Sequence, residues 1–322
     1  MLLGASCLAA VEAALHLAGT APAYDVGRFG EWRFTANLRG HTFQGPRDGH
    51  AFVVTSNDDG LRTSLPRPRT AGRCRIALLG DSTVFGWGVN DDETLATAAD
   101  AALPETAEVL NAGQPGYTTV MAATLFTDVV AAYQPDVTVL FVPMHDTNLV
   151  PVSDLESLRG GADWSASLRV SLSHHSRVYA LLRRALIPGA EDLFVVEQHS
   201  STGQATEHHG SDRVPRVNDD ERTQVLADMR ALAAGWGGEV RIGYVPFLQD
   251  AERQSPARPL DGWMADQAGP TGIVDLRGSA FGQADLVLAD DPGHLSASGN
   301  RTAGLALARS VLANPGRCAA AL

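Results

Sequence analysis

The sequence contains little cysteine, with three residues among 322: Cys7, Cys74 and Cys318. Three cysteines are too few for the disulfide framework that holds small secreted domains together. Cys74 and Cys318 can pair if the two ends of a folded domain meet, and two unpaired thiols are the alternative. No Cys-x-x-Cys motif occurs, so cysteine spacing gives no indication of a zinc site.

Basic residues are also scarce relative to acidic ones. The chain has 25 Lys and Arg against 37 Asp and Glu, a formal net charge of −12. Binding to a phosphate backbone requires clustered positive charge, so the composition argues against a nucleic-acid partner. The apolar content of 44% is ample for a core. A chain of this length fits one large α/β domain with an appendage, or two small domains.

A long apolar run is missing from the amino terminus. Glu12 and His16 interrupt the apolar segment 1–19, and a bilayer span takes about 20 apolar residues. No basic residue precedes the run, which makes it a poor signal peptide. One interpretation is the tail of a membrane anchor whose upstream part precedes this sequence, which implies a membrane-tethered or extracytoplasmic protein. The other is an amphipathic helix packed on the domain, compatible with a cytoplasmic protein.

Residues 20–70 are expected to form an amino-terminal arm of short strands. Its aromatic residues alternate with polar ones: Phe29, Trp32, Phe34, Phe43 and Phe52. The run from Asn57 to Gly60 predicts a turn, and the prolines in the segment Leu65–Arg69 indicate a linker. No chemistry is assigned to the arm, which is expected to cover an edge of the sheet or rim the site.

Residues 71–315 alternate between strand and helix patterns, which is typical of a parallel α/β sheet. The expected architecture is a three-layer α/β/α sandwich with a mainly parallel sheet of about five strands. Polar residues dominate 187–217, which is expected to be a surface insertion. Strands are predicted at 75–79, 108–110, 137–142, 239–245 and 272–276, and helices at 94–103, 118–133, 176–186, from 218 and at 297–312.

Helix-capping residues are visible at three of these boundaries. Thr118 or Thr119 is a plausible cap for the helix that follows. Asn218 has a glutamate three residues later, the spacing of a capping box. The acidic run 90–93 is expected to cap the helix at 94–103.

The stretch around Gly80-Asp81-Ser82 is the centre of the chain's chemistry. An apolar strand ends at Gly80, which places Ser82 on a tight turn at the carboxyl edge of the sheet, where open α/β sheets bind ligands. The free N–H groups of a following helix would point at the same spot and could hold a developing anion. The alternative is a serine that merely caps a helix.

Three further blocks follow in order: 110–117 with Asn111 and Gly113, 139–146 with His145, and 291–296 with Asp291 and His294. This order of blocks resembles the SGNH (GDSL-like) hydrolase family, over about residues 75–312. The resemblance implies an SGNH/flavodoxin-like fold and a serine esterase. It also implies that no metal or organic cofactor is needed.

A catalytic triad follows from the chemistry of ester cleavage. A base must take the serine proton, a carboxylate must hold that base, and donors must face the oxyanion. Ser82 is the candidate nucleophile and His294 the candidate base. Asp291 lies three residues before His294, so one turn could present both side chains to one cleft. The alternative for this pair is a helix-capping turn.

The oxyanion hole is where the sequence departs from the family. The N–H groups of Ser82 and Gly113 are the expected backbone donors. The family usually has Gly-x-Asn-Asp after the third strand, and here Pro143 and His145 stand at the glycine and asparagine positions. His145 could donate in place of the amide, and Asn148 is a rival donor.

Other residues near these blocks receive structural interpretations. Asp81 is expected to be structural, and Trp87 is expected to pack near the site entrance. The pairs at 174–175 and 208–209 are interpreted as solvated loop histidines rather than metal ligands.

Three functions remain open at this point. The first is an esterase for a small-molecule or carbohydrate ester, such as an acetyl or short acyl ester of a carbohydrate or secondary metabolite. The second is an O-acyltransferase with the same triad, and the third is a non-catalytic binding protein on this fold. The sequence indicates no oligomeric state.

Overall fold

The buried strand β5 runs from Cys74 to Gly80 at the heart of the fold, and all seven of its residues are buried. Apolar side chains on both faces of this strand need cover from two layers of helices, as in parallel sheets. The computed structural model describes residues 2–17, 24–26, 32–34, 37–44, 51–67, 71–159, 172, 176, 178–179, 182, 213–245, 260–269, 272–279, 283–289 and 291–322.

Five parallel strands form the central sheet, in the order β11-β10-β7-β5-β6. Numbered along the chain, these strands have the spatial order 2-1-3-4-5, which is the flavodoxin-like order. The order reverses between β5 and β7, so the ligand crevice is expected beyond the carboxyl ends of these two strands. The other strands of this sheet are β6 (Ala107–Gly113), β7 (Val137–Phe141), β10 (Glu239–Tyr244) and β11 (Val274–Asp275), and β5 pairs directly with β6 and β7.

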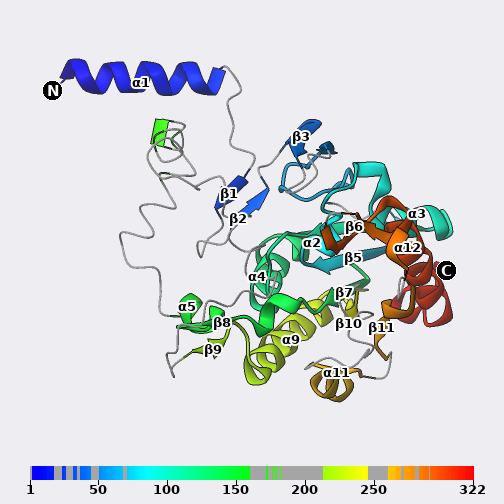
Figure 1. Ribbon diagram of the computed structural model, residues 1–322. Coiled ribbons are helices and arrows are strands. Elements are labelled where there is room, and N and C mark those ends of the chain that lie inside the picture. Colours follow the sequence, from blue (N-terminus) through cyan, green and yellow to red (C-terminus); the bar gives the residue numbers. More distant parts are fainter. Residues whose placement is uncertain are drawn as a thin grey trace.

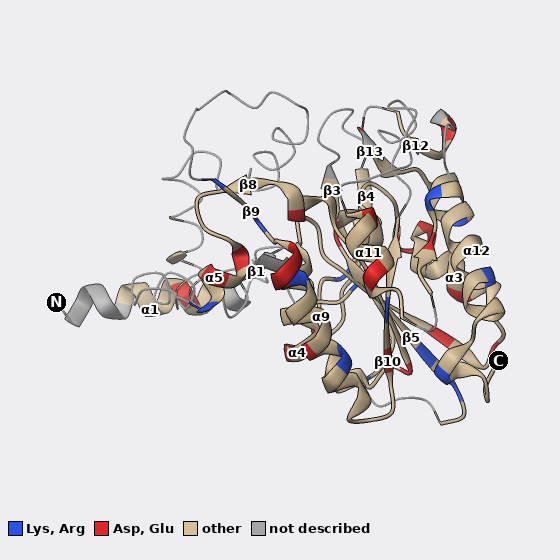
Figure 2. Ribbon diagram, turned by 90° about the horizontal axis from the view of Figure 1, so that it is seen from below, with Lys and Arg blue, Asp and Glu red and all other residues tan. Residues whose placement is uncertain are grey.

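Helices cover both faces of the sheet, giving the three layers expected from the sequence (Figure 1; Figure 2). On one face α3 (Leu95–Ala102) packs against α12 (Ala297–Ala313). On the other face α4 (Thr119–Asp128) packs against α9 (Asp219–Ala234). The side chains of α11 (Asp261–Gln267) join the core on the α4 and α9 side.

Shorter elements connect and flank these layers. Two antiparallel strand pairs lie outside the central sheet: β8 (Leu149–Val150) with β9 (Val214–Pro215), and β12 (Val287–Leu288) with β13 (Asp291–Leu295). The remaining short elements described from residue 71 onward are α2 (Ser82–Phe85), η1 (Asp91–Glu93), η2 (Val130–Tyr133), η3 (Met144–Thr147), α5 (Asp154–Arg159), η4 (Arg277–Ser279), η5 (Ala284–Leu286) and η6 (Gly316–Cys318).

The predicted caps are confirmed at two helices and wrong at a third. Thr118 caps α4 by accepting from the Met121 N–H, and Asn218 forms the capping box of α9 with Glu221. The helix expected over 118–133 is interrupted at Val129 and continues as η2. The acidic run 90–93 does not cap α3: Thr94 does, and the run contributes the separate turn η1.

Part of the prediction lies outside the described residues. This holds for most of the helix expected at 176–186, for most of the insertion expected at 187–217, and for Phe29 in the arm. The division of the chain into 1–19, 20–70 and 71–315 stays a prediction.

The described part of the arm contains two antiparallel hairpins, β1-β2 (Tyr24–Val26, Trp32–Phe34) and β3-β4 (His41–Gln44, Ala51–Val54). Phe43 and Phe52 of the second hairpin form a buried aromatic cluster with Phe85 and Trp87. The ring centroids of Phe52 and Trp87 lie 5.0 Å apart, edge to face. This hairpin therefore packs on α2 and the turn that follows it, and Trp87 is a core residue of that contact.

A disulfide joins the start of the central strand β5 to the carboxyl-terminal segment of the chain. Cys74, at the start of β5, forms a disulfide with Cys318 in η6, with their Cα atoms 5.3 Å apart. This resolves the pairing that the sequence left open, while Cys7 is a free, exposed thiol. At the amino terminus the helix α1 spans Leu2–Leu17. Among the described residues, none of the helices has both the length and the apolar character that a bilayer crossing requires.

Candidate active site

Ser82 is the first residue of the one-turn helix α2, directly beyond the end of β5. The helix is closed by backbone bonds from the Phe85 N–H to the Asp81 carbonyl at 3.0 Å and from the Gly86 N–H to the Ser82 carbonyl at 3.1 Å. Asp81 caps the helix, because its carboxylate accepts from the Thr83 N–H at 3.0 Å. Asp81 thus has the structural role expected from the sequence.

His294 and Asp291 reach Ser82 from the far end of the chain. His294 Nε2 lies 2.7 Å from Ser82 Oγ, and His294 Nδ1 lies 2.8 Å from Asp291 Oδ2. The side chains of His294 and Asp291 are 11% and 18% exposed, so the pair is sheltered but reachable. The three predicted triad residues are therefore within hydrogen-bond reach of one another.

The local backbone of His294 differs from the expected turn. Asp291 and His294 lie on β13, whose pairing with β12 jumps from Val287↔Leu295 to Leu288↔Asp291. The residues between these two pairs bulge out of the ladder, and bulges commonly redirect a side chain toward an active site. The helix α12 begins only afterwards, capped by Ser296, whose Oγ accepts from the Gly299 N–H at 3.2 Å.

This geometry suits proton transfer. A carboxylate on Asp291 accepts the Nδ1–H of His294, which leaves Nε2 free to accept the proton of the Ser82 hydroxyl. A serine activated in this way can attack an acyl carbon, and a developing oxyanion then needs donors nearby. The N–H of Ser82 is suitable, since the first N–H groups of a helix lack intrahelical acceptors.

Gly113 is not placed to be the second donor. Its N–H donates to Asn111 Oδ1 at 3.1 Å, so that hydrogen is already engaged. A Cβ at this position would lie 2.3 Å from the Phe85 N, so Gly113 is the point where β6 passes directly beneath α2. Gly113, which the sequence predicts to be an oxyanion donor, therefore supports the Ser82 helix through close packing instead.

Gly116 is a further candidate for the second backbone donor, and it is absent from the residues predicted from the sequence. It is buried, has a φ of 73°, and follows Pro115 in the turn beyond the end of β6. The strand ends Gly80 and Gly113 pair in register, so Ser82 and Gly116 both lie just past the same edge of the sheet. The signal was available in the sequence as a Pro-Gly turn at the carboxyl end of a strand.

The loop after β7 carries the two rival side-chain donors. His145 belongs to η3 and Asn148 follows it, and both are partly buried. Within the described part of the chain, neither side chain is hydrogen-bonded to Ser82. Both side chains therefore lie on the loop that follows β7, the strand next to β5.

Asp146, in the same loop, holds it to two neighbouring helices. It is fully buried, and its carboxylate accepts from the N–H and the hydroxyl of Thr119 at 2.8 and 2.7 Å and from Arg222 Nη1 at 3.2 Å. Burial raises the pKa of Asp146 to about 6, although the bonds from Thr119 and Arg222 oppose that shift. The loop with His145 is thereby tied to the start of α4 and to α9.

No group of three or more His, Cys, Asp or Glu side chains within the described ranges is arranged to hold a metal ion. The histidine pairs at 174–175 and 208–209 lie outside those ranges.

Comparisons with known proteins found similarity only among solved structures. No family model matches the chain, and no curated protein matches it. One similar structure is a putative lipolytic protein of the G-D-S-L family from Desulfitobacterium hafniense DCB-2, with 12% identity, 74% of this chain and 99% of that chain covered, and a TM-score of 0.43.

Two further structures resemble the chain to a similar degree. The inhibitor-bound aryl esterase of M. smegmatis has 15% identity over 75% of this chain and 99% of that chain, with a TM-score of 0.43. The psychrotrophic esterase EstA from Pseudoalteromonas sp. has 11% identity over 74% of this chain and 97% of that chain, with a TM-score of 0.44. These similarities are weak, so the fold is assigned from the strand order of the sheet. That order, 2-1-3-4-5, is the flavodoxin-like order that the SGNH resemblance implies.

Proposed function

We propose that this protein is a serine esterase that cleaves an acyl ester through an acyl-enzyme on Ser82. The single observation that carries the proposal is the continuous link from Asp291 Oδ2 to His294 Nδ1 at 2.8 Å and from His294 Nε2 to Ser82 Oγ at 2.7 Å. These atoms come from segments 212 residues apart in the chain.

The reaction proceeds in two halves. In the first, Ser82 Oγ attacks the ester carbonyl carbon while His294 Nε2 takes the hydroxyl proton, and the tetrahedral intermediate then expels the alcohol, which receives that proton from His294. In the second, water attacks the acyl carbon while His294 Nε2 takes a proton from it, and the tetrahedral intermediate then breaks its bond to Ser82 Oγ, which receives that proton from His294 as the carboxylic acid leaves. Asp291 holds the tautomer of His294 and stabilises the imidazolium in both halves.

Several groups are proposed to stabilise the oxyanion. The Ser82 N–H is one donor, and the Gly116 N–H is proposed as the second in place of Gly113. His145 or Asn148 would supply the third, from the loop that Asp146 anchors. A short acyl ester of a carbohydrate or secondary metabolite is the proposed substrate class, on the strength of the family resemblance alone.

A panel of p-nitrophenyl esters of graded acyl length tests the function. Wild type is expected to hydrolyse the short esters with a burst of p-nitrophenol, and a fluorophosphonate is expected to label Ser82. Ser82→Ala should lose both activities while retaining the wild-type circular dichroism spectrum. A wild-type protein that is folded yet neither turns over esters nor reacts with the fluorophosphonate would instead be a binding protein on this fold.

The acyl acceptor is tested in the same assay. Candidate alcohols are added together with an activated acyl ester, and free acid and acylated alcohol are both quantified. Hydrolysis predicts that free acid dominates at every alcohol concentration. Acylated alcohol in excess of free acid would identify the protein as an O-acyltransferase with the same triad.

A further inference from the structure

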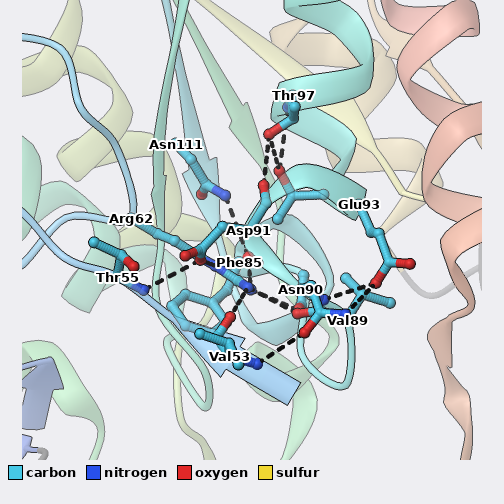
Figure 3. A network of polar contacts seen from close by, with 12 residues as sticks. Val53, Thr55, Arg62, Phe85, Val89, Asn90, Asp91, Glu93, Thr97 and Asn111 are labelled. Carbon is cyan, nitrogen blue, oxygen red and sulfur yellow. Dashed lines mark hydrogen bonds and ion pairs between the residues drawn. The ribbon is translucent and has the colours of Figure 1, made fainter. Parts of the chain in front are cut away.

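Arg62 is a buried cation of the amino-terminal arm that binds the helix carrying Ser82. Its side chain is only 2% exposed, and its guanidinium lies at the centre of the network in Figure 3. Nη1 donates to the carbonyls of Phe85 at 3.1 Å and Gly86 at 2.8 Å, which are the last residue and the cap of α2. Arg62 thus binds both carbonyls at the carboxyl end of α2.

The other donors of Arg62 connect that helix end to its surroundings. Nη2 donates to the carbonyls of Val53 in β4 at 3.0 Å and of Val89 at 2.7 Å. Nε donates to the carboxylate of Asp91 at 2.8 Å, which balances the buried positive charge. The acidic run 90–93 therefore binds the arm, since Asn90 Oδ1 and Asp91 Oδ1 also accept from the backbone N–H groups of Val53 and Thr55.

Packing of Phe85 in the aromatic cluster and of α2 against Gly113 also holds this end of the helix, but few side chains among the described residues bond to its carbonyls. It contains four residues, and so short a helix is unfavourable without external contacts, because each end leaves backbone groups unpaired. Besides Arg62, the Nδ2 of Asn111 reaches the same Phe85 carbonyl at 3.2 Å. A helix of this length spans about 6 Å, so a shift at its carboxyl end is transmitted directly to Ser82 at its first position.

We infer that Arg62 is a positioning residue for catalysis: by binding the Phe85, Gly86 and Val89 carbonyls it holds α2 where Ser82 Oγ meets His294 Nε2. This inference rests on the proposed function. The inference assigns the amino-terminal arm a role in positioning the nucleophile, whereas the sequence alone assigned no chemistry to the arm. Arg62 touches no triad atom, so its effect is on the alignment of the nucleophile.

A cavity beside Arg62 makes the inference testable by chemical rescue. The cavity has a volume of about 1160 Å³ and is lined by Arg62 together with Asn57, Asp91, Asn111 and Tyr133, among others. Replacing Arg62 with alanine opens a space next to this cavity that matches a guanidinium ion. Added guanidinium can then occupy the site, donate to the same carbonyls and pair with Asp91.

The experiment compares Arg62→Ala with Arg67→Ala in the full-length protein. Arg67 is the matched control, because it is another arginine of the arm, it pairs with Asp59, and its side chain is 59% exposed. For Arg62→Ala we expect kcat on p-nitrophenyl acetate to fall about 10²-fold with KM little changed, as for a small misplacement of a reacting group. The rate of fluorophosphonate labelling should fall in parallel, whereas Arg67→Ala should match wild type in both.

Guanidinium chloride, at concentrations far below those that denature the protein, should restore much of the labelling rate of Arg62→Ala in a saturable manner. Sodium chloride at the same ionic strength should not, and wild type should gain nothing from guanidinium. Arg62→Lys keeps the charge but lacks the planar fork, so it should recover less activity than the rescued alanine variant.

Several results would overturn the inference. One is a folded Arg62→Ala that is labelled at the wild-type rate. Another is a slow Arg62→Ala that sodium chloride restores as well as guanidinium does. Unfolding of both Arg62 variants, with Arg67→Ala intact, would also overturn it, because Arg62 would then support the whole domain. Each of these results overturns the inference alone if wild type is still labelled at Ser82. If wild type is not labelled, the proposed esterase function is itself contradicted.

Discussion

The carboxylate of Asp146 accepts hydrogen bonds from both polar groups of Thr119, the N–H at 2.8 Å and the hydroxyl at 2.7 Å, in a fully buried position. These bonds join the loop after β7 to the first residue of α4. The loop carries His145 and Asn148, so the protonation state of one buried acid is linked to the residues proposed as the third oxyanion donor.

The first prediction concerns this acid and the pH dependence of stability. The folded pKa of Asp146, about 6, lies above its ordinary value of 3.8, so the folded state binds the proton more tightly than the unfolded state. The contribution of this group is then fully present below pH 3.8 and is lost as the pH rises through 6. The difference between the two pKa values corresponds to about 3 kcal/mol in the free energy of unfolding.

Urea denaturation at a series of pH values checks this. Subtracting the Asp146→Asn values from the wild-type values should leave a stability difference that falls by about 2.4 kcal/mol between pH 4 and pH 7, because part of the total of about 3 kcal/mol is already lost at pH 4. Asp220→Asn, an exposed acid on α9, is the control and should follow the wild-type pH dependence. A wild-type minus Asp146→Asn difference that does not change with pH would contradict the raised pKa.

The second prediction concerns Asp291. In Asp291→Asn the amide can donate to His294 Nδ1, which would leave the proton on Nε2, where it cannot accept from Ser82. We expect kcat to fall by about 10⁴-fold, as in a comparable triad, with little change in KM. Steady-state kinetics on p-nitrophenyl acetate measure this, with Asp285→Asn, an exposed acid nearby, as the control. Near-normal kcat in Asp291→Asn would remove Asp291 from the triad.

The third prediction separates packing from catalysis at Gly113. In Gly113→Ala the new methyl group meets the Phe85 N at 2.3 Å, so α2 must move. We expect lower thermal stability, by about 1–3 kcal/mol, together with slower fluorophosphonate labelling of Ser82. Gly262→Ala is the matched control, because nothing lies within 4 Å of its Cβ and it is inside the helix α11. That substitution should be neutral or stabilising by up to about 1 kcal/mol.

The fourth prediction decides between His145 and Asn148 as the third donor. If His145 donates, His145→Ala should lower kcat by about 10²–10³-fold while Asn148→Ala has little effect, and the reverse holds if Asn148 donates. His145→Asn is expected to retain or raise turnover, provided that the amide fills the same space. Complete loss of turnover in His145→Asn would indicate a specialised role for the imidazole.

The fifth prediction concerns the disulfide between Cys74 and Cys318. It closes a loop of 244 residues, and loss of such a bond typically costs about 2–5 kcal/mol. The double variant Cys74→Ala/Cys318→Ala should therefore unfold at lower urea concentration than wild type. Cys7→Ser removes the exposed free thiol and should not change the midpoint. Two titratable thiols in the denatured, unreduced protein in addition to Cys7 would show that the bond is absent.

The sequence by itself determined the features that depend on neighbours in the chain. The apolar runs at 76–79 and 137–142 predicted β5 and β7, because a strand buried on both faces is rich in apolar side chains. Thr118 and Asn218 predicted helix starts, because a cap acts within three residues. The four blocks around Ser82, Asn111, His145 and His294 predicted the residues of the candidate site and, through the family resemblance, its fold.

Only the tertiary structure decided what depends on segments that are distant in the chain. Gly113 is needed for packing because α2 lies against it, and no local pattern shows that contact. The bulge in β13 that presents His294, the pairing of Cys74 with Cys318, and the capping of α2 by Arg62 likewise arise from long-range packing. A hydrogen-bond donor is assigned by distance and direction, and the order of residues along a chain specifies neither across a fold.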